Sequence, residues 1–235
     1  MLVLLGLYLT SLYSYLLFHT LVEIFGIVVA AAIFVIAWNT RRLLDNDYLL
    51  FLGISFLFVA LLDSLHTLSY KGMGVFPGLS ANVPTQLWLA SRYLQGLTFL
   101  LAPAFLTRKL PARWTLVAGI VIVTLLLASI FVWPIFPVAY VEGQGLTLFK
   151  IASEYIISGI LLLGGFFLWQ RRRALDRTVW RWLAAGILLN VGAELSFTFY
   201  LGVYDLSNLV GHLFKALSFY CIYKAVVETG LVRPY

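Results

Sequence analysis

Three histidines in apolar stretches of the chain could bind a transition metal. They are His19, His66 and His212, and the sequence contains no others. Neutral imidazole and carboxylate are ligands that zinc, iron and copper accept, and histidine also holds haem iron. Asp63 lies three residues before His66, so both project from one helical face, and Glu194 is an alternative carboxylate. We therefore predict a site for zinc, iron, copper or haem with the ligands His19, Asp63, His66 and His212.

Further charged residues interrupt the same apolar stretches. Burying a charge is costly unless it is paired or used, so each of them needs a reason. Lys150 and Glu154 are four residues apart, as are His19 and Glu23, so each pair shares one helical face. We predict that these charges line a cavity for a small polar or charged ligand, with the lining residues Glu23, Arg92, Lys150, Glu154, Glu194 and Lys215.

Several interpretations of these residues compete. Carboxylates could simply neutralise the buried cations in a structural polar network that joins the helices. The same groups could bind a small ligand, or the histidines could bind a metal or haem. An enzyme is an alternative function, namely a membrane-embedded metal-dependent hydrolase in which His66, His212 and Asp63 hold zinc. A transporter ranks below these, because no apolar stretch is obviously interrupted.

The composition indicates an integral membrane protein. Of the 235 residues, 62% are hydrophobic and only 11% are charged, and the mean hydropathy is +0.97. A soluble domain carries about 25% charged residues. The net charge of +6 does not indicate nucleic acid, because the basic residues lie in short loops. The single cysteine, Cys221, excludes an intramolecular disulfide, and the start of the chain lacks the pattern of a removable signal peptide.

The apolar runs predict an all-α membrane bundle of about eight helices. A span needs about 20 apolar residues. Runs of this kind cover 2–18, 21–39, 48–70, 86–106, 116–133, 149–170, 179–201 and 209–227. One helix through the first two runs would be too long for a single crossing, so we place a break near His19 and Thr20.

Basic residues predict the orientation. They follow the second, fourth, sixth and eighth runs and are rare in the other connections, for example Arg41, Arg108, Arg172 and Arg233. By the positive-inside rule both termini face the cytoplasm, in a multi-pass protein of the inner membrane. Measured from the nearer end of each run, all the charged and histidine residues named above then fall in the outer half of the bilayer.

Several stretches resemble the MASE3 family of membrane-associated sensor domains. They are YLLFHTLVEIF (15–25), FVIAWNTRRLLDNDYLLFLGISFLFVALLDSLHTLSYKGMGVFP (34–77), QLWLASRYLQG (86–96), EGQGLTLFKIASEYII (142–157), ELSFTFY (194–200) and 206–235. The resemblance covers nearly the whole chain in order. Family members often carry Glu where this chain has Gln95.

The resemblance implies a sensor without catalysis of its own. Such domains typically precede a cytoplasmic signalling module, either a histidine kinase or a diguanylate cyclase. We therefore expect residues 1–235 to form one transmembrane sensor domain, cut from a longer chain before that module. The expected partners are membrane lipid, a small-molecule or metal signal, the linked output domain and a second copy in a homodimer, because such outputs work as dimers.

Overall fold

The computed structural model describes residues 2–43, 46–199 and 205–228. Its helices are α1 (Leu2–Tyr13), α2 (Tyr15–Thr40), α3 (Tyr48–Ser69), α4 (Asn82–Leu101), α5 (Ala112–Phe131), α6 (Leu148–Gln170), α7 (Arg177–Ser196) and α8 (Leu206–Tyr223). Short 3-10 turns cover Ala102–Leu106 and Arg172–Ala174, and a π turn covers Lys224–Glu228. The strands β1 (Tyr140–Val141) and β2 (Gly145–Leu146) form an antiparallel hairpin. The predicted all-α class is confirmed.

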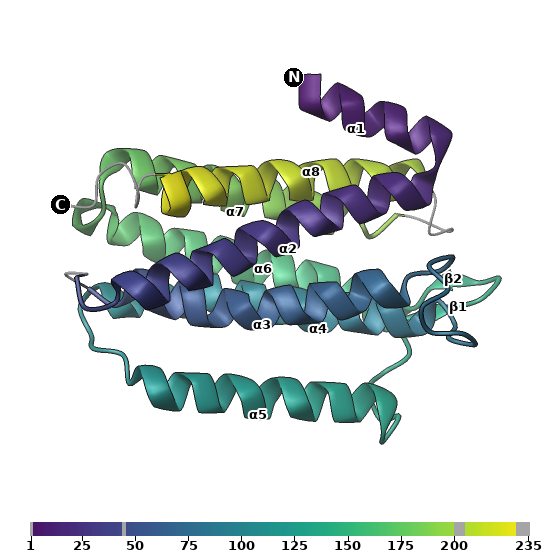
Figure 1. Cartoon of the computed structure of the whole chain (residues 1–235), viewed down its shortest axis with the longest axis horizontal. Coiled ribbons are helices and arrows are strands. Elements are labelled where there is room, and N and C mark those ends of the chain that lie inside the picture. Colours follow the sequence, from purple (N-terminus) through teal and green to yellow (C-terminus); the bar gives the residue numbers. More distant parts are fainter. Residues whose placement is uncertain (1, 44–45, 200–204, 229–235) are drawn as a thin grey trace.

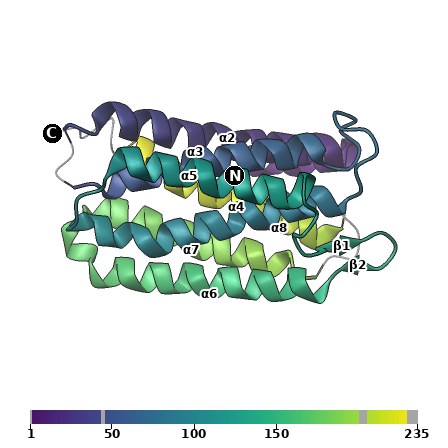
Figure 2. The same cartoon turned by 90° about the horizontal axis from the view of Figure 1, so that it is seen from below.

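Six of the helices form a closed ring. Contacts join α2 to α3, α3 to α4, α4 to α6, α6 to α7, α7 to α8, and α8 back to α2. These helices run along the long axis of the molecule in Figure 1, and Figure 2 shows α2 and α6 at opposite edges. The inside of the ring is thus the one place that side chains from all six helices can share.

Two helices lie outside this ring. The helix α5 packs mainly on α3, and only Val123 and Ile130 of its residues are buried, so most of its apolar surface faces outward (Figure 1). The helix α1 packs on α2 and is 12 residues long. That length is about 18 Å at 1.5 Å per residue, too short to cross the hydrocarbon core alone.

The break between the first two helices differs from the prediction. The structure places it at Ser14, whose side chain accepts a hydrogen bond from the backbone N–H of Leu17 at 3.3 Å and so caps α2. The predicted break at His19 and Thr20 is therefore wrong, because both residues lie inside α2. One consequence is that His19 and Glu23 share a continuous, rigid helix.

Four helices are long and apolar enough to cross a membrane by length and composition, namely α2, α3, α5 and α6. The eight-span count stays a prediction. The remaining ring helices, α4, α7 and α8, have 18 to 20 residues each but carry more polar side chains. Their buried charged side chains, Arg92, Glu194 and Lys215, lie inside the ring.

The two ends of the ring differ in chemistry. One end carries the connections after α2, α4 and α6, with Arg41, Lys109 and Arg173 among their basic residues, and we call it the basic end. The other carries the β1–β2 hairpin and the α3–α4 loop, and we call it the hairpin end (Figure 1). The predicted gathering of basic connections at one end is seen in the described residues, while Arg233 lies outside them.

Candidate functional site

A layer of buried polar side chains fills the ring from its middle to the hairpin end. All ten predicted site residues belong to it, and none is more than 4% exposed. Each ring helix supplies at least one: His19 and Glu23 from α2, Asp63 and His66 from α3, Arg92 from α4, Lys150 and Glu154 from α6, Glu194 from α7, and His212 and Lys215 from α8. The convergence predicted from depth alone is thus matched by the tertiary packing.

Depth within the layer is less uniform than predicted. Arg92 lies near the middle of α4 and Lys215 near the middle of α8, whereas His19 and His66 lie close to the hairpin end. The placement of all of these residues in the outer half of the bilayer stays a prediction. Within the layer, the ion pairs lie nearer the middle of the ring and the histidines lie nearer the hairpin end.

The ion-pair cluster consists of Glu23, Asp63, Arg92 and Lys215. Nη2 of Arg92 donates to both oxygens of Asp63, at 2.7 and 2.6 Å. Nζ of Lys215 lies 2.6 Å from Oε2 of Glu23 and 3.1 Å from Oδ2 of Asp63. Asp63 therefore joins both cations, and Lys215 joins α8 to α2 and α3 at once.

Neighbouring side chains complete this cluster. The hydroxyl of Ser91 donates to Asp63, and Nη1 of Arg92 donates to the side-chain oxygen of Gln95. The charged groups of Arg92 and Lys215 lie 4.7 and 4.6 Å from the ring centroid of Trp88, within cation–π range. Ser91 and Trp88 were not predicted as site residues, since a serine and a tryptophan in an apolar run carry no signal of their own.

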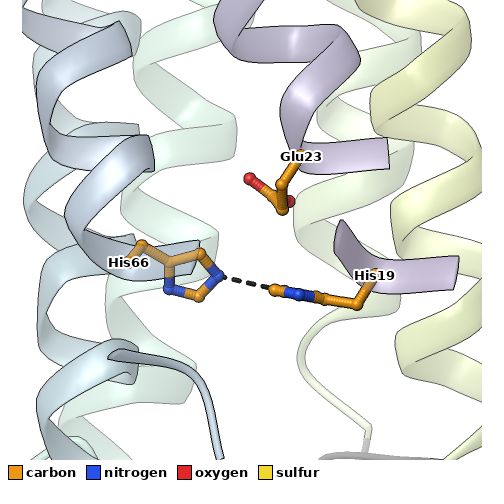
Figure 3. Close-up of side chains that lie close together, drawn as sticks. All are labelled: His19, Glu23 and His66. Carbon is orange, nitrogen blue, oxygen red and sulfur yellow. Dashed lines mark hydrogen bonds between the residues drawn. The ribbon is translucent and has the colours of Figure 1, made fainter. Parts of the chain in front are cut away.

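The histidine cluster consists of His19, His66 and His212. Nε2 of His19 lies 3.3 Å from Nε2 of His66 (Figure 3). The ring centroids of His19 and His212 are 4.8 Å apart, and Nε2 of His212 lies 3.5 Å from Oε1 of Glu23. Three imidazoles and one carboxylate from α2, α3 and α8 thus lie close together, with His212 placed beside Glu23 and the ring of His19.

Backbone and aromatic groups orient these imidazoles. Nδ1 of His66 lies 2.7 Å from the carbonyl oxygen of Pro84, and Nδ1 of His212 lies 2.7 Å from that of Asn208. The ring of His19 stacks on Tyr70 with 3.6 Å between centroids. The rings of His66 and His212 are therefore held by their Nδ1 edges, whereas His19 is held by stacking and its Nδ1 has no hydrogen-bond partner among the described residues.

The carboxylate beside the histidines is Glu23 rather than the predicted Asp63. Ligand atoms of His19, Glu23 and His66 all lie within 4.8 Å of one another, and Figure 3 shows the Glu23 carboxylate beside the gap between the two rings. Asp63 is instead held by Arg92, Lys215 and Ser91. The zinc set of the hydrolase alternative, which needs Asp63 with His66 and His212, does not match this arrangement.

A second buried group lies on α6 and α7. Nζ of Lys150 pairs with Glu154, the predicted i,i+4 pair, and lies 3.4 Å from the carbonyl oxygen of Phe197. Oε2 of Glu194 and the side-chain nitrogen of Asn190 have no hydrogen-bond partner among the described residues. This group holds Lys150, one of the three buried cations of the layer, and Glu154 and Glu194, two of its four buried carboxylates.

The cavity between the histidine cluster and the buried group on α6 and α7 is small. It has a volume of about 20 Å³ and is lined by Tyr70, Trp88, Lys150 and Phe197, with His66 and His212 among the other lining residues. A cavity needs about 10–15 Å³ to hold one water molecule. The space therefore suits one water or one ion, and in this packing it excludes a haem or a hydrolase substrate.

A larger cavity of about 570 Å³ has a different character. It lies between α1, α2 and α8, and its lining is apolar apart from the Tyr220 hydroxyl, with Leu7, Val22 and Ala216 among its residues. Apolar linings of this kind suit apolar chains rather than polar ligands. None of the ten buried site residues lines it.

Comparison with known proteins identifies the family. Residues 10–234 match MASE3, a membrane-associated sensor domain, so the match covers nearly the whole chain. No curated protein and no solved structure matches the chain. The chain, a membrane protein with a buried polar layer inside a helical ring, therefore belongs to the MASE3 family of membrane-associated sensor domains.

Proposed function

We propose that the polar layer is the sensing site of this domain and that α8 carries its state to a cytoplasmic output domain. The observation that carries the proposal is the position of Lys215, which binds carboxylates of α2 and α3 from the middle of α8. A signal that changes the charge or position of either carboxylate therefore changes the ion pairs that hold α8 in place. The same helix reaches the basic end through the π turn at Lys224–Glu228.

Packing contacts beyond Lys215 join α8 to its neighbours toward the basic end. The hydroxyl of Ser218 donates to the carbonyl oxygen of Gly186 on α7 at 2.8 Å, and Phe219 packs against Phe56 of α3. The residues that contact the carboxylates thus come first along the helix, and the packing residues follow toward the basic end. A signal shifts this helix only as far as it binds one arrangement better than the other.

The proposed output is a histidine kinase or diguanylate cyclase that follows the chain and acts as a homodimer. Family membership supports a sensory input rather than an enzyme. The orientation follows from the basic end, which would face the cytoplasm by the positive-inside rule. In that orientation the histidines face the outer side of the inner membrane.

Cysteine labelling tests the orientation. The only natural cysteine, Cys221, is buried, so an introduced cysteine gives a clean signal. Gln144→Cys at the hairpin end and Arg173→Cys at the basic end are matched exposed positions. With a membrane-impermeant maleimide on intact spheroplasts, Gln144→Cys should label, and Arg173→Cys should label only after lysis. The reverse pattern would overturn the orientation.

A fusion tests the relay. A diguanylate cyclase joined after residue 235 reports output as cyclic di-GMP in cells. Lys215→Met should change basal output about fivefold or more, the lower end of usual coupling between sites. Lys109→Met, the same change at an exposed basic-end lysine, is the control. Membrane levels of both variants are measured alongside, and equal output from all three well-expressed proteins would sink the proposal.

A further inference from the structure

The Nε2 atoms of His19 and His66 face each other in the buried interior of the ring. They lie 3.3 Å apart in a buried setting, and each belongs to a different helix. Two nitrogens bound to one tetrahedral metal ion, each at about 2.0–2.1 Å, lie about 3.3 Å apart. The separation therefore matches one edge of a metal coordination tetrahedron as well as it matches a weak hydrogen bond.

Hydrogen-bond donors and acceptors define the state of two of the rings. A backbone carbonyl oxygen only accepts, so Nδ1 of His66 must donate to Pro84, and Nδ1 of His212 must donate to Asn208. In neutral imidazole the lone pair then lies on Nε2 of each ring. Holding the far nitrogen by a carbonyl is the usual way in which proteins orient metal-binding histidines.

Glu23 presents one oxygen to the same point. Its Oε2 pairs with Lys215 at 2.6 Å, whereas its Oε1 has no hydrogen-bond partner among the described residues. Oε1 lies 3.5 Å from Nε2 of His212, which is likewise without a hydrogen-bond partner there. With neutral His212 these are two lone-pair acceptors facing each other in a buried site, an arrangement that calls for a cation between them.

The charge of the layer favours an added cation. The layer holds four buried carboxylates, from Glu23, Asp63, Glu154 and Glu194, but only three buried cations, from Arg92, Lys150 and Lys215. Lys150 and Lys215 already pair with carboxylates, so they do not repel an ion at the histidines as free charges would. One formal negative charge remains for a bound ion to neutralise.

We propose that His19, His66 and Glu23, whose ligand atoms all lie within 4.8 Å of one another, bind one transition-metal ion of the imidazole-preferring class, zinc or copper, and that His212 beside Oε1 of Glu23 joins them as the fourth ligand. A small movement of the His212 ring would bring the fourth ligand in from α8 and close the coordination sphere, as in sites without catalysis. Magnesium and calcium prefer oxygen ligands and do not suit this set. The cavity of about 20 Å³ beside His66 and His212 is too small for a haem.

The ion would act on the sensing element directly. Binding draws charge from Oε1 of Glu23, the carboxylate that also holds Lys215 of α8. Metal occupancy therefore weakens or redirects the pair that joins α2 to α8. This consequence rests on the proposed relay through α8, whereas the site itself does not.

Metal content of the purified domain tests the site. The domain is purified with a tag that lacks histidine, stripped with a chelator, and incubated with Zn²⁺, Cu²⁺ or, as a control, Mg²⁺. We expect about one equivalent of zinc or copper per chain by elemental analysis and none of magnesium. Co²⁺ should give visible bands of tetrahedral coordination by nitrogen and oxygen.

Two isosteric variants make the test specific. Glu23→Gln changes a buried carboxylate of the proposed ligand set, whereas Glu142→Gln is the same change at an exposed residue outside the polar layer. Glu23→Gln should weaken metal binding about tenfold or more, by analogy with other ligand-shell changes, and Glu142→Gln should leave it unchanged. His66→Ala and His212→Ala should abolish binding, with folding checked by thermal melting in detergent.

The outcomes separate the site from the relay. If stripped protein takes up no zinc or copper above the magnesium control, or if both glutamine variants bind like the wild type, the metal site is overturned. A proton shared by His212 and Glu23 is then the cation, and the Lys215→Met test of the relay still stands. If metal binds as expected but leaves the output of the cyclase fusion unchanged, the site holds and its sensing role fails.

Discussion

The ring is held together differently in its two parts. Toward the hairpin end, charged and histidine side chains from six helices fill the interior. Toward the basic end, small residues let the helices touch. A Cβ on Gly164 of α6 would lie 2.9 Å from the backbone of Phe99 and Leu100 on α4, and a Cβ on Gly53 of α3 would lie 2.5 Å from Cβ of Ala37 on α2.

This difference separates a switchable part from a rigid one. Ion pairs and imidazoles can exchange partners with little change in volume, so two arrangements of them can be close in free energy. A helix that lies against the backbone of its neighbour cannot shift without opening a gap, because protein interiors are close-packed. We therefore expect signals to act in the polar layer, while the helices toward the basic end move together as one rigid unit.

The largest expected effect comes from breaking the ion-pair cluster. Asp63→Ala leaves Arg92 and Lys215 buried with one carboxylate fewer between them. Removing one partner of a buried ion pair costs about 3–5 kcal/mol, because the remaining charge stays uncompensated. We expect a loss of this size in the free energy of unfolding, measured by denaturant titration of the detergent-solubilised domain.

A double variant controls for this result. Asp63→Ala combined with Arg92→Met removes both partners and should recover part of the loss, since exchange of a whole buried pair for apolar groups is often near neutral. If Asp63→Ala alone costs less than about 1 kcal/mol, the range of an exposed pair, then the polar layer does not hold the ring.

A medium effect is expected where the helices touch at the basic part. Gly164→Ala places a methyl group against the backbone of α4, which cannot give way as a side chain can. Overpacking of this kind costs about 1–3 kcal/mol. The matched control is Gly165→Ala, whose Cβ would meet only the Ile187 side chain at 3.5 Å.

The same denaturant titration measures this pair of variants. Gly165→Ala should be neutral or slightly stabilising, because alanine favours the helix. In the cyclase fusion, Gly164→Ala should reduce the response to any signal without removing metal binding. Equal stability of the two variants would contradict the division into a switchable and a rigid part.

Much of the fold could be predicted from the sequence because it depends on properties that can be counted along the chain. Span positions follow from runs of apolar residues, and the clustering of basic connections follows from counting alternate loops. The polar layer follows from the distance of each charge from a helix end. The outer position of α5 was also readable, since residues 115–131 lack any charged side chain that would need an interior.

The partners within the layer could not be predicted in the same way. Depth along a helix says nothing of how the helix is rotated or which helix is its neighbour. The contact of α8 with α2 closes the ring and brings His212 to Glu23, whereas α4 brings Arg92 to Asp63. Asp63 was assigned to the histidines because it precedes His66 in sequence, but it faces a different neighbour.

The smallest effect is expected at the hairpin end outside the ring. Nζ of Lys71 in the α3–α4 loop lies 3.0 Å from Oε2 of Glu142 beside β1, and both side chains are about half exposed. This hydrogen bond, with a weaker one from the N–H of Ala81, lowers the pKa of the Glu142 carboxyl below its usual value of 4.5. An exposed pair of this kind contributes little, because water and salt screen it.

The change Glu142→Gln tests that expectation, with the melting temperature of the domain measured at neutral pH and at about pH 3. Because folding lowers this pKa, the contribution of the pair is present above the usual value and is lost as the pH falls through the lowered one. The variant should therefore melt slightly below the wild type at neutral pH, by less than Gly164→Ala, and together with it at low pH. A loss at neutral pH as large as that of Asp63→Ala would show that the loops, and not the polar layer, hold the hairpin end together.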